Sequence, residues 1–405
     1  MPQTRDLSLR PRRRAAFSTA GLCALLLAAA FGASSVHAQS ASIKVGIVGP
    51  FSGPFAHYGT LFRNGAEAYV ASQGGKLAGK TVEFIYRDTG GPNPGVTRTL
   101  VQELIVKDKV DYLGGFVFTP NAFAAAPLAQ QSQTPMVVFN AATSAITDRS
   151  EFIIRTSYTL WQVTVPLAQW ASKNGIKKVV TAVTDYGPGI DGEKAFNSEF
   201  AKQGGTVVES IRMPIATTDF APFVQRIKAS GAQAVYAFLP GGPPNLGFVK
   251  AYNDNGLAKA GIRFLGTAET DEYDLPKFGD AAVGLTTAFH YSAAHPSAAN
   301  QKFIAALKAR DANAVVNYAV VGAWDGMHVI HKMIEATGGQ RDGVKAIAAV
   351  RGLQWESPRG PVRIDPKTRH IVQNVYLRQV QKRGNELVNV ELQNFGPQID
   401  WGLDK

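Results

Sequence analysis

Residues 135–144 are the part of this sequence whose side chains most clearly predict chemistry. An apolar run at residues 136–139 predicts a buried parallel strand. It is followed by small residues, which leave backbone amides uncovered and supply a hydroxyl group: Ala141, Ala142 and Thr143. N–H and O–H donors that converge at the end of a strand can hold a carboxylate without a charged side chain. An ordinary strand-to-helix turn would look the same, so the rest of the chain must decide between the two interpretations.

Motifs for known catalytic or phosphate-binding sites are missing from the sequence. The glycine-rich stretch that begins at Gly49 does not have the spacing of a dinucleotide-binding loop, and Pro50 and Pro54 remove amides that a pyrophosphate would need. No phosphate-binding loop and no nucleophile elbow occurs. His328 and His331 are spaced for one helix face but lack the metalloprotease pattern. We therefore predict a binding protein, not an enzyme, with no metal and no cofactor.

The N-terminus predicts a secretory signal peptide over residues 1–38. Residues 5–14 are basic, residues 22–30 are apolar, and a small-residue cleavage site ends at Ala38. Arg13–Arg14 leaves the choice between general secretion and twin-arginine export open. Cys23, the one cysteine of the chain, lies within this signal, so the mature protein would have no disulfide. We expect a periplasmic protein.

The net charge of the chain is +11, and the signal holds five arginines and one aspartate, which leaves about +7 for the mature protein. These charges suit an anionic ligand. They are dispersed, however, and no basic run is interleaved with aromatic residues, so we expect no nucleic-acid partner.

Strand and helix patterns alternate after the signal, which predicts an α/β protein with parallel sheets covered by helices. The length favours two lobes over one very wide sheet. Three late helical patterns and an extended tail then suggest that the chain returns to the first lobe. We predict two Rossmann-like lobes with a ligand cleft at the hinge: residues 41–158 with 287–361, and residues 159–286 with 362–405.

Three motifs in this order give the chain a family resemblance. They are Ser52-Gly53-Pro54 with Tyr58-Gly59, Ala141-Ala142-Thr143, and Asp185-Tyr186-Gly187. The mature chain resembles, over essentially its whole length, the type I periplasmic solute-binding proteins of ABC importers, in the leucine/isoleucine/valine-binding branch. The resemblance implies the two-lobed fold of that family.

The resemblance also implies roles for single residues. Thr119 stands where the family has a serine that binds the ligand carboxylate, and Ala141, Ala142 and Thr143 would contact the same group. Tyr58 would line the cleft from the opening loop. Tyr186 would close over the ligand from the second lobe.

Two departures from the family pattern leave the ligand open. Glu269 stands one position later than the glutamate that pairs the ammonium of an amino-acid ligand, and such a shift can turn a side chain out of the cleft. Pro240 and the glycines after it replace an aromatic contact, and Phe118 could supply a flat wall instead. Tyr158 and Trp161 at the lobe crossing could do the same. The ligand is therefore either a branched-chain amino acid or an aromatic or keto acid.

The expected partners are a small carboxylate ligand and an inner-membrane ABC permease with its ATPase subunits, and we expect a monomer. A sensory module of the same fold, which presents ligand to a receptor or sensor kinase, is the alternative. An exported amidase-like hydrolase is a third possibility, but no nucleophile–base pair can be named for it.

Overall fold

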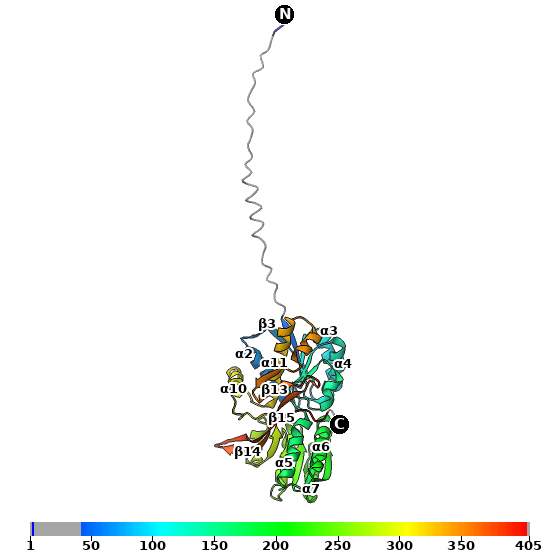
Figure 1. The fold of residues 1–405 in the computed structure, drawn as a ribbon, viewed down its shortest axis with the longest axis vertical. Coiled ribbons are helices and arrows are strands. Elements are labelled where there is room, and N and C mark those ends of the chain that lie inside the picture. Colours follow the sequence, from blue (N-terminus) through cyan, green and yellow to red (C-terminus); the bar gives the residue numbers. More distant parts are fainter. Residues whose placement is uncertain (1, 4–41, 403–405) are drawn as a thin grey trace. The chain divides into compact units, whose positions relative to one another are not determined.

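The computed structural model describes residues 2–3 and 42–402 (Figure 1). The described residues 42–402 belong to one compact unit. The predicted signal peptide, including Cys23 and the cleavage site at Ala38, lies outside the described residues except for residues 2–3. No helix in the described ranges is long and apolar enough to cross a membrane.

The first sheet has six strands and places the predicted carboxylate loop at the end of one of them. Its order is β2 (Lys76–Leu77), β3 (Lys80–Asp88), β1 (Ile43–Gly49), β4 (Tyr112–Gly115), β5 (Met136–Val138) and β6 (Ile153–Arg155). All pairs except β2–β3 are parallel; for example, Val45 of β1 lies opposite Phe84 of β3 and Tyr112 of β4. Central strand β1 is almost wholly buried, as a parallel strand covered on both faces must be.

Helices cover both faces of this sheet (Figure 1). Helices α3 (Pro94–Val106) and α4 (Thr119–Ser132) share one apolar cluster with one face, and the 3₁₀ helix η1 (Ser144–Arg149) adds to it. Helices α2 (Ala56–Ser72) and α11 (Tyr318–Thr337) cover the other face, together with α10 (Ala298–Arg310) and α12 (Gly343–Val350). The late helices α10, α11 and α12 therefore pack on the sheet of the first lobe.

The second sheet has nine strands. Its order is β12 (Gln354–Ser357), β13 (Gly360–Ile364), β14 (Ile371–Arg383), β11 (Thr286–Phe289), β10 (Arg263–Gly266), β9 (Ala234–Phe238), β7 (Lys178–Thr184) and β8 (Thr206–Met213), with β15 (Glu386–Gln398) paired to β14. Helices α5 (Leu160–Lys173) and α6 (Gly187–Lys202) pack on one face, and α7 (Ala221–Ala229) and α8 (Pro243–Asp254) on the other. The short elements α9 (Leu275–Phe278) and η2 (Gly279–Ala282) lie between β10 and β11.

The expectation of purely parallel sheets is wrong for the second sheet. Strand β14 runs antiparallel to β11, β13 and β15, and β12 runs antiparallel to β13. These last four strands follow one another through short turns with no crossover helix, and a short connection can join only antiparallel neighbours. The α/β two-lobed fold itself is confirmed.

Strand pairing also bears on the lobe boundaries. Strand β11, which ends at Phe289, and strands β12 and β13, which begin at Gln354, all pair within the second sheet. The predicted boundary after residue 286 falls inside β11, and the one after residue 361 falls inside β13. We propose instead that the second lobe keeps β11 and takes the chain back at β12, while residues 156–159 form the first crossing.

Two glycines of α11 let that helix lie directly on the strand that carries the predicted loop. A Cβ atom at Gly322 would come 2.3 Å from the Phe139 carbonyl oxygen, and one at Gly326 would meet the Phe139 ring at 2.1 Å. Only glycine permits so close an approach between backbones. Helix α11 therefore fixes the end of β5, where the loop begins.

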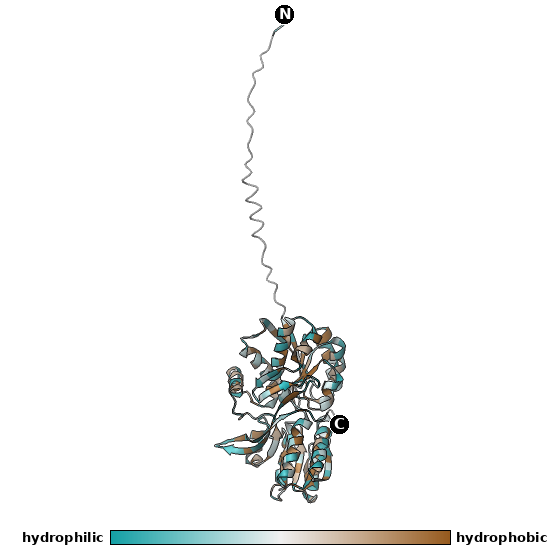
Figure 2. Ribbon diagram, viewed as in Figure 1, coloured by the Kyte–Doolittle hydropathy of each residue, from teal (hydrophilic) through white to brown (hydrophobic). Residues whose placement is uncertain are grey.

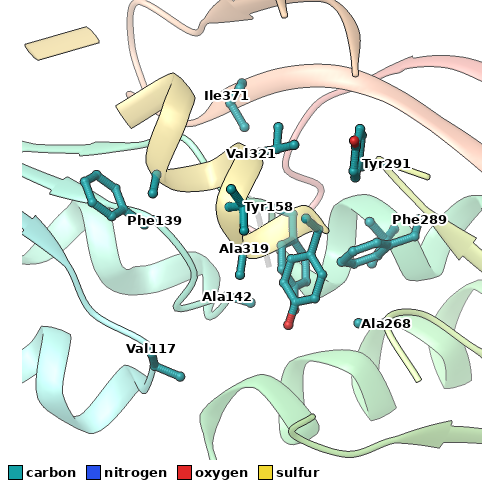
Figure 3. Close-up of a cluster of buried hydrophobic side chains, with 14 of the residues drawn as sticks. Val117, Phe139, Ala142, Tyr158, Ala268, Phe289, Tyr291, Ala319, Val321 and Ile371 are labelled. Carbon is teal, nitrogen blue, oxygen red and sulfur yellow. The ribbon is translucent and has the colours of Figure 1, made fainter. Parts of the chain in front are cut away.

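Apolar residues (brown in Figure 2) gather along the strands and the helix faces that meet them. One cluster of buried apolar side chains is shared by both lobes, because it includes Val117 and Ala142 of the first and Ala268 and Phe289 of the second. In Figure 3 these side chains and Tyr158 face a common region between α11 and the second-lobe elements.

Candidate ligand-binding site

Four of the predicted carboxylate-binding residues lie together and are buried. Thr119 begins α4, and its hydroxyl lies 2.9 Å from the hydroxyl of Thr143, in a hydrogen bond that either group can donate. Ala141 and Ala142 connect β5 to this pair. The structure therefore brings these residues together, although Thr119 and Thr143 are 24 positions apart in the sequence.

The backbone donors of this loop are not equally available. The Ala141 N–H already donates to the Phe116 carbonyl at 2.9 Å, so Ala141 cannot offer its amide to a ligand. Among the described residues, no hydrogen bond uses the amides of Ala142 and Thr143. One hydroxyl of the threonine pair donates within the pair, so the other hydroxyl and these two amides are the donors left for a ligand.

Two helix N-termini converge on the threonine pair from opposite lobes. Helix α4 begins at Thr119, and helix α6 begins at Gly187, where a Cβ atom would come 2.6 Å from the Thr143 hydroxyl oxygen and 3.2 Å from the Thr119 methyl carbon. The N-terminus of a helix carries a partial positive charge. Two such ends that face one point favour an anion there, which is the chemistry that a carboxylate ligand offers.

A fully buried arginine supports the loop from behind. The Arg155 guanidinium donates to the Thr143 carbonyl and, at 3.3 Å, to the Tyr158 carbonyl. Burial lowers the pKa of Arg155 to about 10, which still leaves it charged at neutral pH. Sequence reasoning missed this residue, because nothing around the last position of a short strand distinguishes it from a surface arginine.

Tyr58 lies where the two lobes meet. Its hydroxyl is 3.0 Å from the hydroxyl of Tyr318, the first residue of α11, and it accepts the N–H of Gly241 from the second lobe at 3.2 Å. Burial raises the pKa of Tyr58 well above that of a free tyrosine, so the phenol stays protonated. Tyr318 is a second residue that the sequence did not reveal, since 260 positions separate it from its partner.

Aromatic rings come to this region from both lobes. Tyr186 of the second lobe is half-buried and stacks on Phe238 at a centroid distance of 6.2 Å. Phe118 of the first lobe is buried against Phe55, edge to face at 4.9 Å. Tyr158 of the first crossing packs on Phe289 at 4.8 Å. Flat rings at these positions suit a flat ligand.

Glu269 is buried but already has partners of its own. One carboxylate oxygen accepts the Leu239 N–H at 3.1 Å, and the other accepts the N–H of Thr267 and, at 3.4 Å, its hydroxyl. Glu269 thereby ties the end of β9 to the end of β10 and holds the buried Pro240 that follows Leu239. Burial raises the pKa of Glu269 to about 7.

Further contacts across the lobe boundary show that the lobes touch on both sides of the site. The Ser144 N–H of the first lobe donates to Asp191 of α6 at 2.9 Å, and Asn317, which caps α11, donates to Asp271 at 3.0 Å. The His57 ring stacks on Tyr273 at 4.2 Å. The two lobes are therefore in direct contact, and this arrangement is called the closed form below.

The histidine pair lies away from this region. His328 and His331 of α11 both place Nδ1 at 3.1 Å from the hydroxyl of Tyr69 of α2. No group of three or more metal-ligating side chains occurs within residues 42–402.

Comparison with known proteins places this geometry in a family. Residues 42–385 match the model of the periplasmic binding protein family. The "Leu/Ile/Val-binding protein homolog 6" of Brucella melitensis is 51% identical over 383 residues, which cover 94% of this chain and 98% of the relative.

Solved structures show the same fold at similar identity. The solute-binding protein of an ABC transporter from Rhodopseudomonas palustris HaA2, in complex with p-hydroxybenzoic acid, is 53% identical, with a TM-score of 0.88 over 90% of this chain and 99% of that one. A solute-binding protein from R. palustris BisB5, in complex with 3,4-dihydroxybenzoic acid, is 44% identical, with a TM-score of 0.85 over 89% and 99%. The chain belongs to the periplasmic binding protein family, among the solute-binding proteins of ABC transporters, as its three loop motifs predicted.

Proposed function

We propose that this protein is the exported solute-binding component of an ABC importer and that its ligand is an aromatic carboxylate of the hydroxybenzoate class. It would carry the ligand to a permease with ATPase subunits, acting as a periplasmic monomer after cleavage near Ala38, and would do no chemistry on it. The names of the relatives favour transport over the sensory alternative.

The state of Glu269 is the observation that carries the choice of ligand. An amino-acid ligand needs an acceptor for its ammonium group, because a buried charge without a partner is strongly disfavoured. The Glu269 carboxylate is occupied by two backbone N–H groups and the Thr267 hydroxyl of its own lobe. A benzoate has no ammonium group and makes no such demand.

The remaining features of the site support the same ligand class. Thr119, Thr143 and the two helix ends would receive the carboxylate. Phe118, Tyr158 and Tyr186 would enclose the ring. The two ligands named for the similar solved structures, p-hydroxybenzoic acid and 3,4-dihydroxybenzoic acid, have this shape.

A thermal-shift and calorimetry series on the purified protein tests the proposal. A ligand that binds only the native state raises the melting temperature. When the ligand concentration is 100 times the dissociation constant, the native state is stabilised by about 2.7 kcal/mol. We expect 4-hydroxybenzoate and benzoate to stabilise the protein, and the uncharged methyl ester of 4-hydroxybenzoate to have no effect.

Leucine, valine and phenylalanine serve as the amine-bearing comparison. Stabilisation by leucine or valine, together with no effect of the benzoates, would refute the aromatic ligand and restore the branched-chain interpretation. Phenylalanine separates the two features, because it combines an aromatic ring with an ammonium group. We expect it to bind more weakly than benzoate.

A further inference from the structure

The backbone of the loop that follows β9 contacts a side chain of the first lobe directly. Gly241 of the second lobe donates its N–H to the Tyr58 hydroxyl at 3.2 Å. A Cβ atom at Gly241 would come 2.9 Å from that hydroxyl oxygen, closer than real carbon atoms approach, while its other neighbours would lie at ordinary distances of 3.6 and 3.7 Å. One atom of the first lobe therefore excludes a side chain at this position.

The Tyr58 hydroxyl cannot easily move aside. It is buried and is held by the Tyr318 hydroxyl at 3.0 Å as well as by Gly241. The backbone of Gly241 is fixed too, since the preceding Leu239 N–H is bound by Glu269 and the following Gly242 N–H is bound by Asp274 at 2.7 Å. Neither lobe can yield without breaking a buried hydrogen bond.

We propose that Gly241 is the positioning residue that sets how far the two lobes close, because its missing side chain lets the Tyr58 hydroxyl rest on its backbone amide. Gly187 has the same relation to the hydroxyl of Thr143 at the other end of the site. This inference rests on the proposed function, in which closure over the ligand is the working motion. When the lobes part, the space beside Gly241 opens, so a methyl group there opposes only the closed form.

The variant Gly241→Ala tests this proposal with little effect on the fold itself. Gly241 does not have a positive φ, so alanine can adopt its backbone conformation. Overpacking of a tight contact typically weakens it by an amount that corresponds to a roughly 5- to 150-fold loss of affinity for 4-hydroxybenzoate. A cooperative thermal transition without ligand shows that the variant is folded. Gly95→Ala is the matched control, because a Cβ atom there meets its nearest neighbour only at 3.8 Å.

The double variant Tyr58→Phe/Gly241→Ala identifies the clash. Tyr58→Phe alone removes the hydroxyl and loses some affinity through the lost hydrogen bonds. In the Tyr58→Phe background the added methyl group should cause no further loss, because the atom that it strikes is gone. Equal losses from Gly241→Ala in both backgrounds would overturn the proposal, since a merely local defect would not depend on Tyr58.

A direct measurement of lobe separation keeps this inference distinct from the choice of ligand. Cysteines introduced at the exposed Ala71 of α2 and Ala229 of α7 carry spin labels. The one natural cysteine, Cys23, lies in the predicted signal peptide, so it would not be labelled in the mature protein. Gly241→Ala should shift the distance distribution toward the open form, with and without 4-hydroxybenzoate. If the natural protein binds no aromatic acid, the proposed function fails, but the shift still decides the role of Gly241; an unchanged distribution would overturn it.

Discussion

The Arg359 guanidinium lies 2.6 Å from the Asp325 carboxylate, and both side chains are shielded from solvent. Arg359 belongs to the turn between β12 and β13 of the second lobe, whereas Asp325 lies on α11 of the first. The same guanidinium donates to the carbonyl of Thr156 at 3.0 Å and lies 3.3 Å from Nδ1 of His290, which follows β11. One arginine therefore joins α11 to the chain after β6, at Thr156, and to the chain after β11, at His290.

Replacement of Arg359 by Met should strongly destabilise the protein. It would leave the Asp325 carboxylate buried without its charge partner, which typically costs about 3–5 kcal/mol of unfolding free energy. Urea denaturation measures this loss. The control is Arg310→Met, which breaks the ion pair with Glu67 at the surface and should cost less than about 1 kcal/mol. Similar losses of unfolding free energy in both variants would mean that the buried Arg359–Asp325 pair contributes no more to stability than a surface ion pair.

Thr143→Val should weaken binding of 4-hydroxybenzoate while the fold persists. Valine keeps the shape of threonine but removes the hydroxyl that faces Thr119, and a hydrogen bond to a charged group contributes about 1.5–3 kcal/mol, or a roughly 10- to 150-fold change in affinity. Isothermal calorimetry gives the affinity. Thr337→Val, which removes a buried hydroxyl bound within α11, is the control and should bind normally. An unchanged dissociation constant for Thr143→Val would place the carboxylate elsewhere.

Glu269 should make the protein less stable as the pH rises. Burial raises its pKa from 4.5 to about 7 in the folded state, so the folded protein holds a proton that the unfolded chain has lost between these values. The stabilisation is complete below pH 4.5 and is lost as the pH rises through 7, by up to about 3 kcal/mol. Unfolding free energies of the natural protein and of Glu269→Gln are measured from pH 4.5 to 8. The difference between the two curves gives the contribution of Glu269 titration to stability. Parallel curves would show that Glu269 does not titrate in this range.

His57 should make closure weaker in acid. Burial, and then the nearby charge of Lys277, lower its pKa from 6.5 to about 4 in the closed form, where its ring stacks on Tyr273 and lies beside Tyr58. Opening would restore an ordinary pKa near 6.5, so protons favour the open form below that pH. Affinity for 4-hydroxybenzoate should fall roughly 10- to 30-fold more between pH 7 and 5 than it does for His57→Phe. Identical pH profiles in the two proteins would contradict this account.

Much of the fold could be predicted from the sequence because its signals are local. The apolar run before Ala141 and the alternation of strand and helix patterns depend on near neighbours, and they predicted most of the strands and helices. The place of β14 beside β11 was not predicted, because the pairing of strands that lie far apart in the sequence is decided by packing over long distances. The prediction of a carboxylate-binding loop rests on a local signal of the same kind, because Ala141, Ala142 and Thr143 follow one another.

The sequence by itself determined the family and the two-lobed α/β fold, and it predicted the strand end that would carry the site. Only the tertiary structure decided what each side chain does there. The Glu269 carboxylate accepts hydrogen bonds from the amides of Leu239 and Thr267. The Tyr58 hydroxyl accepts one from the amide of Gly241, which lies 183 positions away. A hydrogen bond depends on tenths of an ångström between atoms that the fold brings together, and no spacing along the chain contains that information.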